Sequence, residues 1–157
     1  MQIFKDSLIE CSFDELKKEI ITFKFFQYIS SPLLSFKMKG AKEDRLWSIA
    51  PQSLELYLFS LIPFGTQIVV PQKLESCRGQ FKIADNGSGS FFKEWMHIIS
   101  LTKVSETSVR YKDQITFESK FSNGGSFLFL WLLLVIRHWR LKKFVTVNLF
   151  KTDHPTH

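Results

Sequence analysis

The sequence has little cysteine, proline and glycine, and each shortage narrows the kind of protein it can encode. Of its 157 residues, two are cysteine, five are proline and seven are glycine. The cysteines, Cys11 and Cys77, match no metal-ligand or redox spacing, so we expect reduced thiols in a cytoplasmic protein. No proline- or glycine-rich linker and no internal repeat divides the chain. This predicts a single domain over residues 1–150, followed by a polar tail over residues 151–157.

Long hydrophobic runs are equally scarce. The amino terminus lacks the basic start and apolar stretch of a secretory signal. The longest apolar run covers residues 127–136 and ends at Arg137. As a helix, such a run is about 15 Å long, roughly half the thickness of a bilayer's hydrocarbon core. It therefore predicts a buried helix, or a helix at a membrane surface, and not a membrane-spanning one.

Phenylalanine and local positive charge are what the sequence has in excess. There are 17 Phe against 3 Tyr and 4 Trp, so much bulky apolar surface carries few polar groups. The net charge is +6, and the basic excess lies in residues 137–151, which contain no acid. We interpret these residues as a solvated helix end that complements the helix dipole. The alternative is contact with anionic lipid headgroups through Arg137, Arg140, Lys142 and Lys143. No nucleic-acid recognition motif is present, so nucleic acid is not expected as a partner.

The first quarter of the chain predicts a strand, one or two short helices and a second strand. Residues 2–12 alternate loosely, as in a strand. Ser12 and Glu15 form a capping box at a helix start. The helical pattern stops before Pro32, and residues 33–37 begin a second strand.

From about residue 46 the hydrophobic period becomes two, which is typical of strands. Pro71 cannot donate to a ladder, so its strand lies at an edge or carries a bulge. Further strands are expected over residues 67–77, 78–84, 92–103 and 107–119, with turns at residues 63–65 and 85–89.

After these strands, residues 123–125 end the sheet and Ser126 caps a closing helix. Helices kept apart from an antiparallel sheet define an α+β fold, in which a curved sheet grips the long C-terminal helix. The first half of that helix is apolar all round, and the sheet covers one side of it. A second apolar surface must therefore exist, at a ligand cavity, a partner chain or a lipid surface.

Several short strings, taken in order, resemble the SRPBCC or START-like helix-grip superfamily, which includes polyketide cyclases and lipid-transfer domains. The strings cover most of the chain: residues 30–33 with Phe36, residues 61–65, residues 85–87 with Gly89, Phe92 and Lys93 with Trp95 and His97, Tyr111 with Asp113, and residues 137–140. Similar strings occur in small uncharacterised bacterial proteins. The resemblance implies a deep apolar cavity between the sheet and the C-terminal helix, but no single activity.

His97 and Asp113 are the polar pair that most strongly indicates a functional site. If the hairpin closes through residues 104–106, they lie directly opposite on an otherwise apolar face. We interpret them as a pair that satisfies itself in the sheet or holds a ligand hydroxyl; a register shift of two residues would separate them. Acid–base catalysis by His97, oriented by Asp113, is the alternative. The histidines have no metal-ligand spacing and no glycine-rich phosphate loop is present, so neither metal nor cofactor is expected.

These observations predict a carrier or sensor that binds a small hydrophobic molecule, such as a lipid, isoprenoid or polyketide, without catalysis. The alternatives are a cyclase- or dehydratase-type enzyme and an interaction protein, for instance a homodimer, that buries residues 127–136. The cytoplasmic protein could then also be peripheral to a membrane. The expected ligand-binding residues are Trp95, His97, Ile99, Tyr111, Asp113, Ile115, Phe117, Trp131 and Leu134.

Overall fold

The computed structural model describes residues 1–38, 51–74 and 77–149, so the predicted strand start near Leu46 lies outside the described residues. In chain order the elements are β1 (Gln2–Ile9), α1 (Phe13–Ile20), α2 (Phe23–Ser30), β2 (Leu34–Met38), β3 (Gln52–Leu58), β4 (Ile62–Val69), β5 (Pro71–Lys73), β6 (Gln80–Gly89), β7 (Phe92–Lys103), β8 (Val109–Ser119), α3 (Asn123–Phe144) and a short π-helix, η1 (Val145–Leu149).

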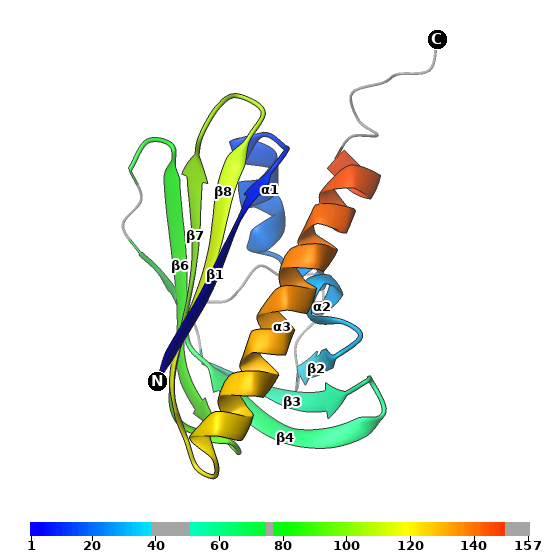
Figure 1. Ribbon diagram of the computed structural model, residues 1–157, viewed down its shortest axis with the longest axis vertical. Helices are drawn as coiled ribbons and strands as arrows, with labels where there is room; N and C mark the ends of the chain where they lie inside the picture. Colours follow the sequence, from blue (N-terminus) through cyan, green and yellow to red (C-terminus); the bar gives the residue numbers. More distant parts are fainter. Residues whose placement is uncertain (39–50, 75–76, 150–157) are drawn as a thin grey trace.

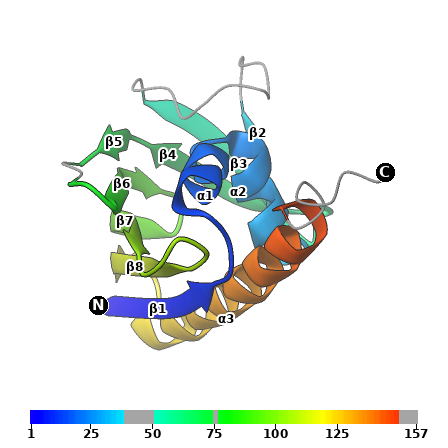
Figure 2. The ribbon, with the colours of Figure 1, turned by 90° about the horizontal axis from the view of Figure 1, so that it is seen from above.

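The strands form one curved antiparallel sheet, in the order β1-β8-β7-β6-β4-β3-β2, with β5 paired to β6. The long helix α3 runs diagonally across this sheet (Figure 1). Seen from above, α1 and α2 lie in the hollow of the sheet, and α3 closes one side of it (Figure 2). The predicted α+β helix-grip architecture is confirmed.

Each of the two short helices begins directly after an N-cap residue whose hydroxyl accepts a hydrogen bond from the first turn. The Ser12 hydroxyl accepts a hydrogen bond from the Glu15 amide at 3.2 Å, as the capping box predicts. The Thr22 hydroxyl does the same for the Phe25 amide at 3.2 Å and starts α2. The apolar residues of both helices recur at helical spacing and are buried, those of α1 against the sheet and those of α2 largely against α3.

The closing helix starts earlier than predicted. Ser122, not Ser126, is its N-cap: the Ser122 hydroxyl accepts from the Gly125 amide at 3.3 Å. Gly124 and Gly125 therefore form the first turn of α3 instead of a connecting turn. Ser126 lies inside the helix, and its hydroxyl is 2.8 Å from that of Ser119 on β8.

Two predicted turns are wrong. Residues 63–65 lie within β4, and the chain reverses just before them, at Phe59 and Ser60, which both have positive φ. Residues 85–89 lie within β6, whose last residues pair with β4 in the sheet. A Cβ added at Gly87 would stand 1.8 Å from the Ile68 carbonyl oxygen. This glycine therefore permits close backbone approach between two strands, and not a turn.

The register of the β7–β8 hairpin also differs from the prediction. Lys103 pairs with Val109, so the loop spans residues 104–108, and the Val104 amide donates to the Ser108 carbonyl at 3.0 Å. His97 consequently lies opposite Ile115, and Asp113 lies opposite Ile99. The loop is two residues longer than predicted. The partner of each β7 residue on β8 therefore lies two positions further along the chain than predicted.

The space between β8 and α3 is packed solid. Ile115 and Phe117 from the sheet meet Leu130, Leu133 and Leu134 from α3, and each side chain is at most 4% exposed. A second cluster joins α1, α2 and the far end of α3 to the sheet. The expected cavity between the sheet and α3 is therefore absent at these residues, because bulky side chains fill the gap.

Candidate ligand site

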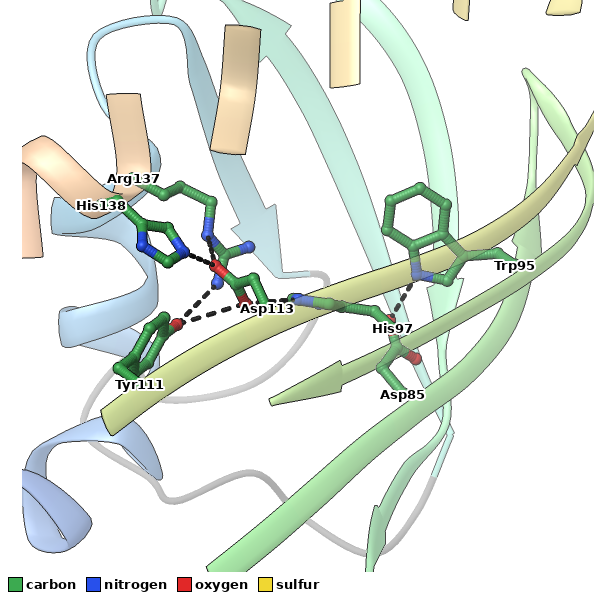
Figure 3. A network of polar contacts seen from close by, with 7 residues as sticks. All are labelled: Asp85, Trp95, His97, Tyr111, Asp113, Arg137 and His138. Atoms are coloured by element: carbon green, nitrogen blue, oxygen red, sulfur yellow. Dashed lines mark hydrogen bonds and ion pairs between the residues drawn. The ribbon is translucent and has the colours of Figure 1, made fainter. Parts of the chain in front are cut away.

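A fully buried carboxylate, Asp113, organises a polar cluster (Figure 3). Along β8 it lies between Tyr111, which belongs to the second hydrophobic cluster, and Ile115, which belongs to the first. Asp113 Oδ1 lies 2.8 Å from His97 Nε2 and accepts a longer hydrogen bond, 3.3 Å, from the Tyr111 hydroxyl. His97 reaches it diagonally from β7, since its own partner Ile115 lies two residues beyond Asp113 on the same face of β8. Diagonal neighbours on one face of a sheet are within reach of long side chains. The predicted pair thus forms despite the register error.

The second oxygen of Asp113 faces α3. Arg137 Nε lies 3.3 Å and His138 Nε2 lies 3.5 Å from Oδ2. The Arg137 guanidinium is also 5.0 Å from the centre of the Phe26 ring, and its Nη2 donates to the Tyr111 hydroxyl at 3.5 Å. His138 Nδ1 lies 2.8 Å from the Ser7 hydroxyl on β1. One carboxylate thus connects β7, β8 and α3.

Charge pairing governs the ionisation of this cluster. Burial alone would raise the pKa of Asp113, but the adjacent Arg137 charge and contacts from His138 and His97 hold it well below its ordinary value. Burial would likewise lower the pKa of Arg137, and Asp113 more than offsets this. Burial and Asp113 raise the pKa of Tyr111 far above its usual range. Asp113 and Arg137 therefore form an ion pair, and Tyr111 stays neutral.

The ionised state of Asp113 fixes the tautomer of His97. An ionised carboxylate accepts hydrogen bonds only, so the proton between the two residues belongs to His97 Nε2. In the neutral ring, Nδ1 then carries the lone pair and accepts a hydrogen bond. Among the described residues Nδ1 has no hydrogen-bond partner. The Nδ1 atom of His97 is therefore available to accept a hydrogen bond from a ligand, or to take up a proton as a base.

A cavity of about 310 Å³ lies between strands β5–β7 and helices α1 and α2, and His97 lines it. This volume is at the lower end of the range of roughly 300–1,000 Å³ for small-molecule sites. Most of its wall is apolar. The lining residues are Lys17, Ile21, Phe26, Pro71, Gln72, Lys73, Phe81, Ile83, Ala84, Asp85, His97 and Ile99.

Asp85 is a second carboxyl group in this wall. Its Oδ1 accepts from the Val70 amide at 2.9 Å, and its Oδ2 accepts from Trp95 Nε1 at 3.0 Å (Figure 3). Burial raises the pKa of Asp85, although His97 and these two hydrogen bonds act against the rise. Both oxygens are already engaged, so Asp85 shapes the cavity wall more than it offers a free group.

Of the nine residues predicted to bind a ligand, the structure places His97 and Ile99 in the cavity wall. Trp95 lies next to the wall through its bond to Asp85. Tyr111 and Asp113 stand behind His97 in the polar cluster, whereas Ile115, Phe117 and Leu134 are core residues. Trp131 is 50% exposed on the outer side of α3. Sequence reasoning missed the contribution of α1, α2 and β5 to the cavity.

The basic residues of α3 do not share one surface. Arg137 is 2% exposed and pairs with Asp113, so it neither belongs to a solvated helix end, as predicted, nor can meet a membrane, as the alternative required. Arg140 stacks on the Tyr28 ring at 4.1 Å, and its Nε donates to the Tyr28 carbonyl. Lys142 and Lys143 are exposed. The predicted patch is therefore reduced to two lysines.

Other chemistry finds little support in the described part of the chain. No group of three or more potential metal ligands gathers there. Burial, with Glu15 nearby, raises the pKa of the Cys11 thiol to about 11, so this cysteine is a poor nucleophile. None of the helices between residues 1 and 149 that the structure describes is long and apolar enough to cross a bilayer.

A curved antiparallel sheet, two short helices after β1 and a long C-terminal helix define the START-like helix-grip fold, and the predicted resemblance is confirmed at the level of the fold. The chain is similar to a START superfamily protein from Mycobacterium smegmatis, with a TM-score of 0.69 and 12% identity over 92% of this chain and 97% of that one.

Two further solved structures show the same similarity. For a protein from Thermus thermophilus the TM-score is 0.66 at 9% identity, over 94% of this chain and 98% of that one. For Ara h 8.0201 the TM-score is 0.61 at 11% identity, over 94% of this chain and 99% of that one. No family model and no curated protein matches the sequence. At these identities the similarity establishes the fold.

The polar cluster predicts how stability depends on pH. The native pKa of Asp113 lies below its unfolded value, near 3.9, so its stabilising effect is complete above that value and is lost as pH falls further. The pKa of Asp85 is raised in the folded state, so its contribution to stability changes with pH in the opposite direction. We expect the difference in unfolding free energy between wild type and Asp113→Asn to shrink below about pH 4. Urea unfolding at pH 7, 4 and 3 measures this, and Asp85 is common to both proteins. A difference that stays constant to pH 3 would contradict the ion pair.

Proposed function

We propose that this chain is a carrier or sensor that binds one small apolar molecule in the cavity between β5–β7 and the helices α1 and α2. The observation that carries the proposal is an apolar cavity whose wall includes His97, a histidine held in one tautomer by a buried carboxylate. The START-like fold of the solved structures supports it, since such a fold suits a ligand cavity.

The chemistry of the wall narrows the ligand class. At about 310 Å³, the cavity suits a molecule of isoprenoid or small polyketide size better than a two-chain lipid. Because His97 Nδ1 is an acceptor in the neutral ring, the ligand best served carries a hydroxyl or another hydrogen-bond donor on an apolar frame.

Native mass spectrometry of the purified chain, followed by solvent extraction, tests this proposal. The expected result is a retained apolar compound with at least one hydrogen-bond donor, bound at one per chain. A chain that retains nothing, and that binds no apolar fluorescent probe such as an anilinonaphthalene sulfonate, would contradict it.

A variant that fills the cavity sharpens the test. Ile83 lines the cavity from β6, and Ile83→Trp places a larger side chain in that space. We expect affinity for the retained compound or the probe to fall at least tenfold, because ligand and indole compete for one volume. Fluorescence titration measures it.

Ile98→Trp is the matched control for that variant. Ile98 lies on the neighbouring strand β7 but faces the outer side of the sheet, beside Ser100 and Lys82. Its affinity should equal that of the wild type. Equal losses in both variants would mean that the probe binds elsewhere.

An acid–base enzyme is the second candidate, and the His97–Asp113 contact at 2.8 Å favours it. A histidine oriented by a carboxylate, with its other nitrogen unpaired, has the geometry of a general base. Incubating the extracted compound with the protein separates the two functions by mass spectrometry. An unchanged compound supports a carrier, whereas a product that disappears with His97→Gln supports the enzyme.

A further inference from the structure

The outer side of α3 is apolar along most of its length. Leu128 is 66% exposed, Trp131 50%, Leu132 42% and Trp139 59%. With the half-buried Val135, these residues recur every three or four positions and so form one stripe, called here the outer face of α3. In Figures 1 and 2 this helix has one flank turned away from the sheet.

The core does not require this stripe. The opposite side of α3 already fills the interior through residues such as Leu130, Leu134 and Leu141, each at most 1% exposed. Folding would proceed as well with polar residues on the outer face. A continuous exposed apolar stripe of this kind marks an interaction surface.

The charges at the end of the stripe indicate what covers it. Lys142 and Lys143 continue the outer face toward the C-terminal end of α3, and Lys143 Nζ lies 5.6 Å from the centre of the Trp139 ring. Residues 123–144 contain no acid at all. The surface that meets this face must therefore be apolar opposite the stripe and negatively charged opposite the lysines.

A second copy of the chain does not meet that requirement through α3. In a parallel helix pair the lysines would face lysines. In an antiparallel pair they would face the N-terminal end of the other helix, the positive end of its dipole. An anionic bilayer offers both properties at once, since headgroup phosphates accept from lysine, and tryptophan prefers the interface between hydrocarbon and water.

We propose that the outer face of α3 docks on an anionic membrane surface, with Trp131 and Trp139 in the headgroup region and Lys142 and Lys143 against lipid phosphates. The helix lies along the surface, since its 22 residues would extend about 33 Å and one side remains packed on the sheet. This docking does not depend on a ligand in the cavity.

Flotation of the full chain with lipid vesicles tests the docking. Vesicles of 70% phosphatidylcholine and 30% phosphatidylserine are compared with pure phosphatidylcholine. We expect clear binding to the anionic vesicles, a shift of tryptophan emission to shorter wavelength, and weakening in 0.5 M salt. No binding to anionic vesicles at millimolar lipid would overturn the proposal.

Two variants assign the contact to the outer face. Trp131→Ala with Trp139→Ala should reduce vesicle binding at least tenfold. Lys142→Glu with Lys143→Glu should reduce binding to the anionic vesicles by roughly ten- to thirtyfold and leave pure phosphatidylcholine unaffected. All four positions are exposed, so circular dichroism should show an unchanged fold.

Phe4→Ala is the matched control. Phe4 is 63% exposed on β1, but it points to the other side of the sheet from Ile3 and Ser7, which face the core and α3. Its vesicle binding should equal the wild type's. An equal loss in Phe4→Ala would overturn the assignment. So would a dimer, seen by analytical ultracentrifugation, that the tryptophan variant abolishes.

Discussion

Replacing Asp113 by asparagine is expected to lower the free energy of unfolding by about 3–5 kcal/mol. The carboxylate is fully buried, and the change leaves the charge of Arg137, itself 2% exposed, without its partner. His97 and His138 also lose a negatively charged neighbour, since their Nε2 atoms lie 2.8 Å and 3.5 Å from the two carboxylate oxygens of Asp113. Urea unfolding at pH 7, followed by circular dichroism, measures the effect.

Glu118→Gln on the same strand is the control. Glu118 forms an ion pair of 2.8 Å with Lys93, but both side chains are about half exposed. Removing this pair should cost less than about 1 kcal/mol, because solvent screens it and its ordering costs entropy. Similar losses in both variants would contradict a special role for burial.

The double variant Asp113→Asn with Arg137→Met separates the two partners. If the single change destabilises the protein because it leaves the Arg137 guanidinium buried and unpaired, removal of that charge should restore a large part of the stability. A double variant that is as unstable as the sum of both single changes would show instead that the carboxylate acts through His97 and His138.

Replacing Gly87 by alanine should be the second large effect, a loss of about 3 kcal/mol. The new Cβ would stand 1.8 Å from the Ile68 carbonyl oxygen, and a backbone atom cannot rotate away as a side chain can. β4 must therefore move from β6 and weaken the pairing that joins β2, β3 and β4 to the rest of the sheet. Urea unfolding measures the loss.

Gly124→Ala makes the same chemical change where there is room. Its nearest neighbour to an added Cβ is the Ser122 hydroxyl oxygen at 4.0 Å, in the first turn of α3. This variant should gain about 0.4–1 kcal/mol, because alanine restricts the unfolded chain. A Gly87 variant as stable as the wild type would contradict the close approach of the two strands.

The polar cluster also relates to ligand binding. Asp113 does not line the cavity, yet it sets which nitrogen of His97 carries the proton. Changing Asp113 would thus alter both stability and the hydrogen-bonding character of the wall. For this reason Ile83→Trp, which leaves the cluster intact, is the cleaner probe of the cavity.

Arg137 illustrates a signal that the sequence contains and the prediction misses. It lies three residues after Leu134 and four before Leu141, both on the buried side of α3, so helical spacing puts it on that side too. The prediction instead groups it with the basic residues of a solvated helix end, although an arginine can be buried when it has a charged partner. Its partner, Asp113, is itself predicted to face inward.

Local pattern was sufficient for the elements themselves. Alternation in β7 and β8, the cap at Ser12 and the apolar run before Arg137 are short-range features, and each predicted its strand, helix start or helix correctly. The order of these elements then led to the helix-grip fold, because few topologies satisfy one sheet and one long apolar helix.

Contacts between segments distant in sequence decided which glycines lie in strands and where the cavity is. Gly87 and Gly89 resemble a turn in sequence, but the approach of β4 makes them part of a strand. The volume left by α1, α2 and β5, not the face of α3, determined where the cavity lies. A cavity is the difference between the space that a backbone encloses and the volume of side chains from many elements, so no single segment's pattern encodes it.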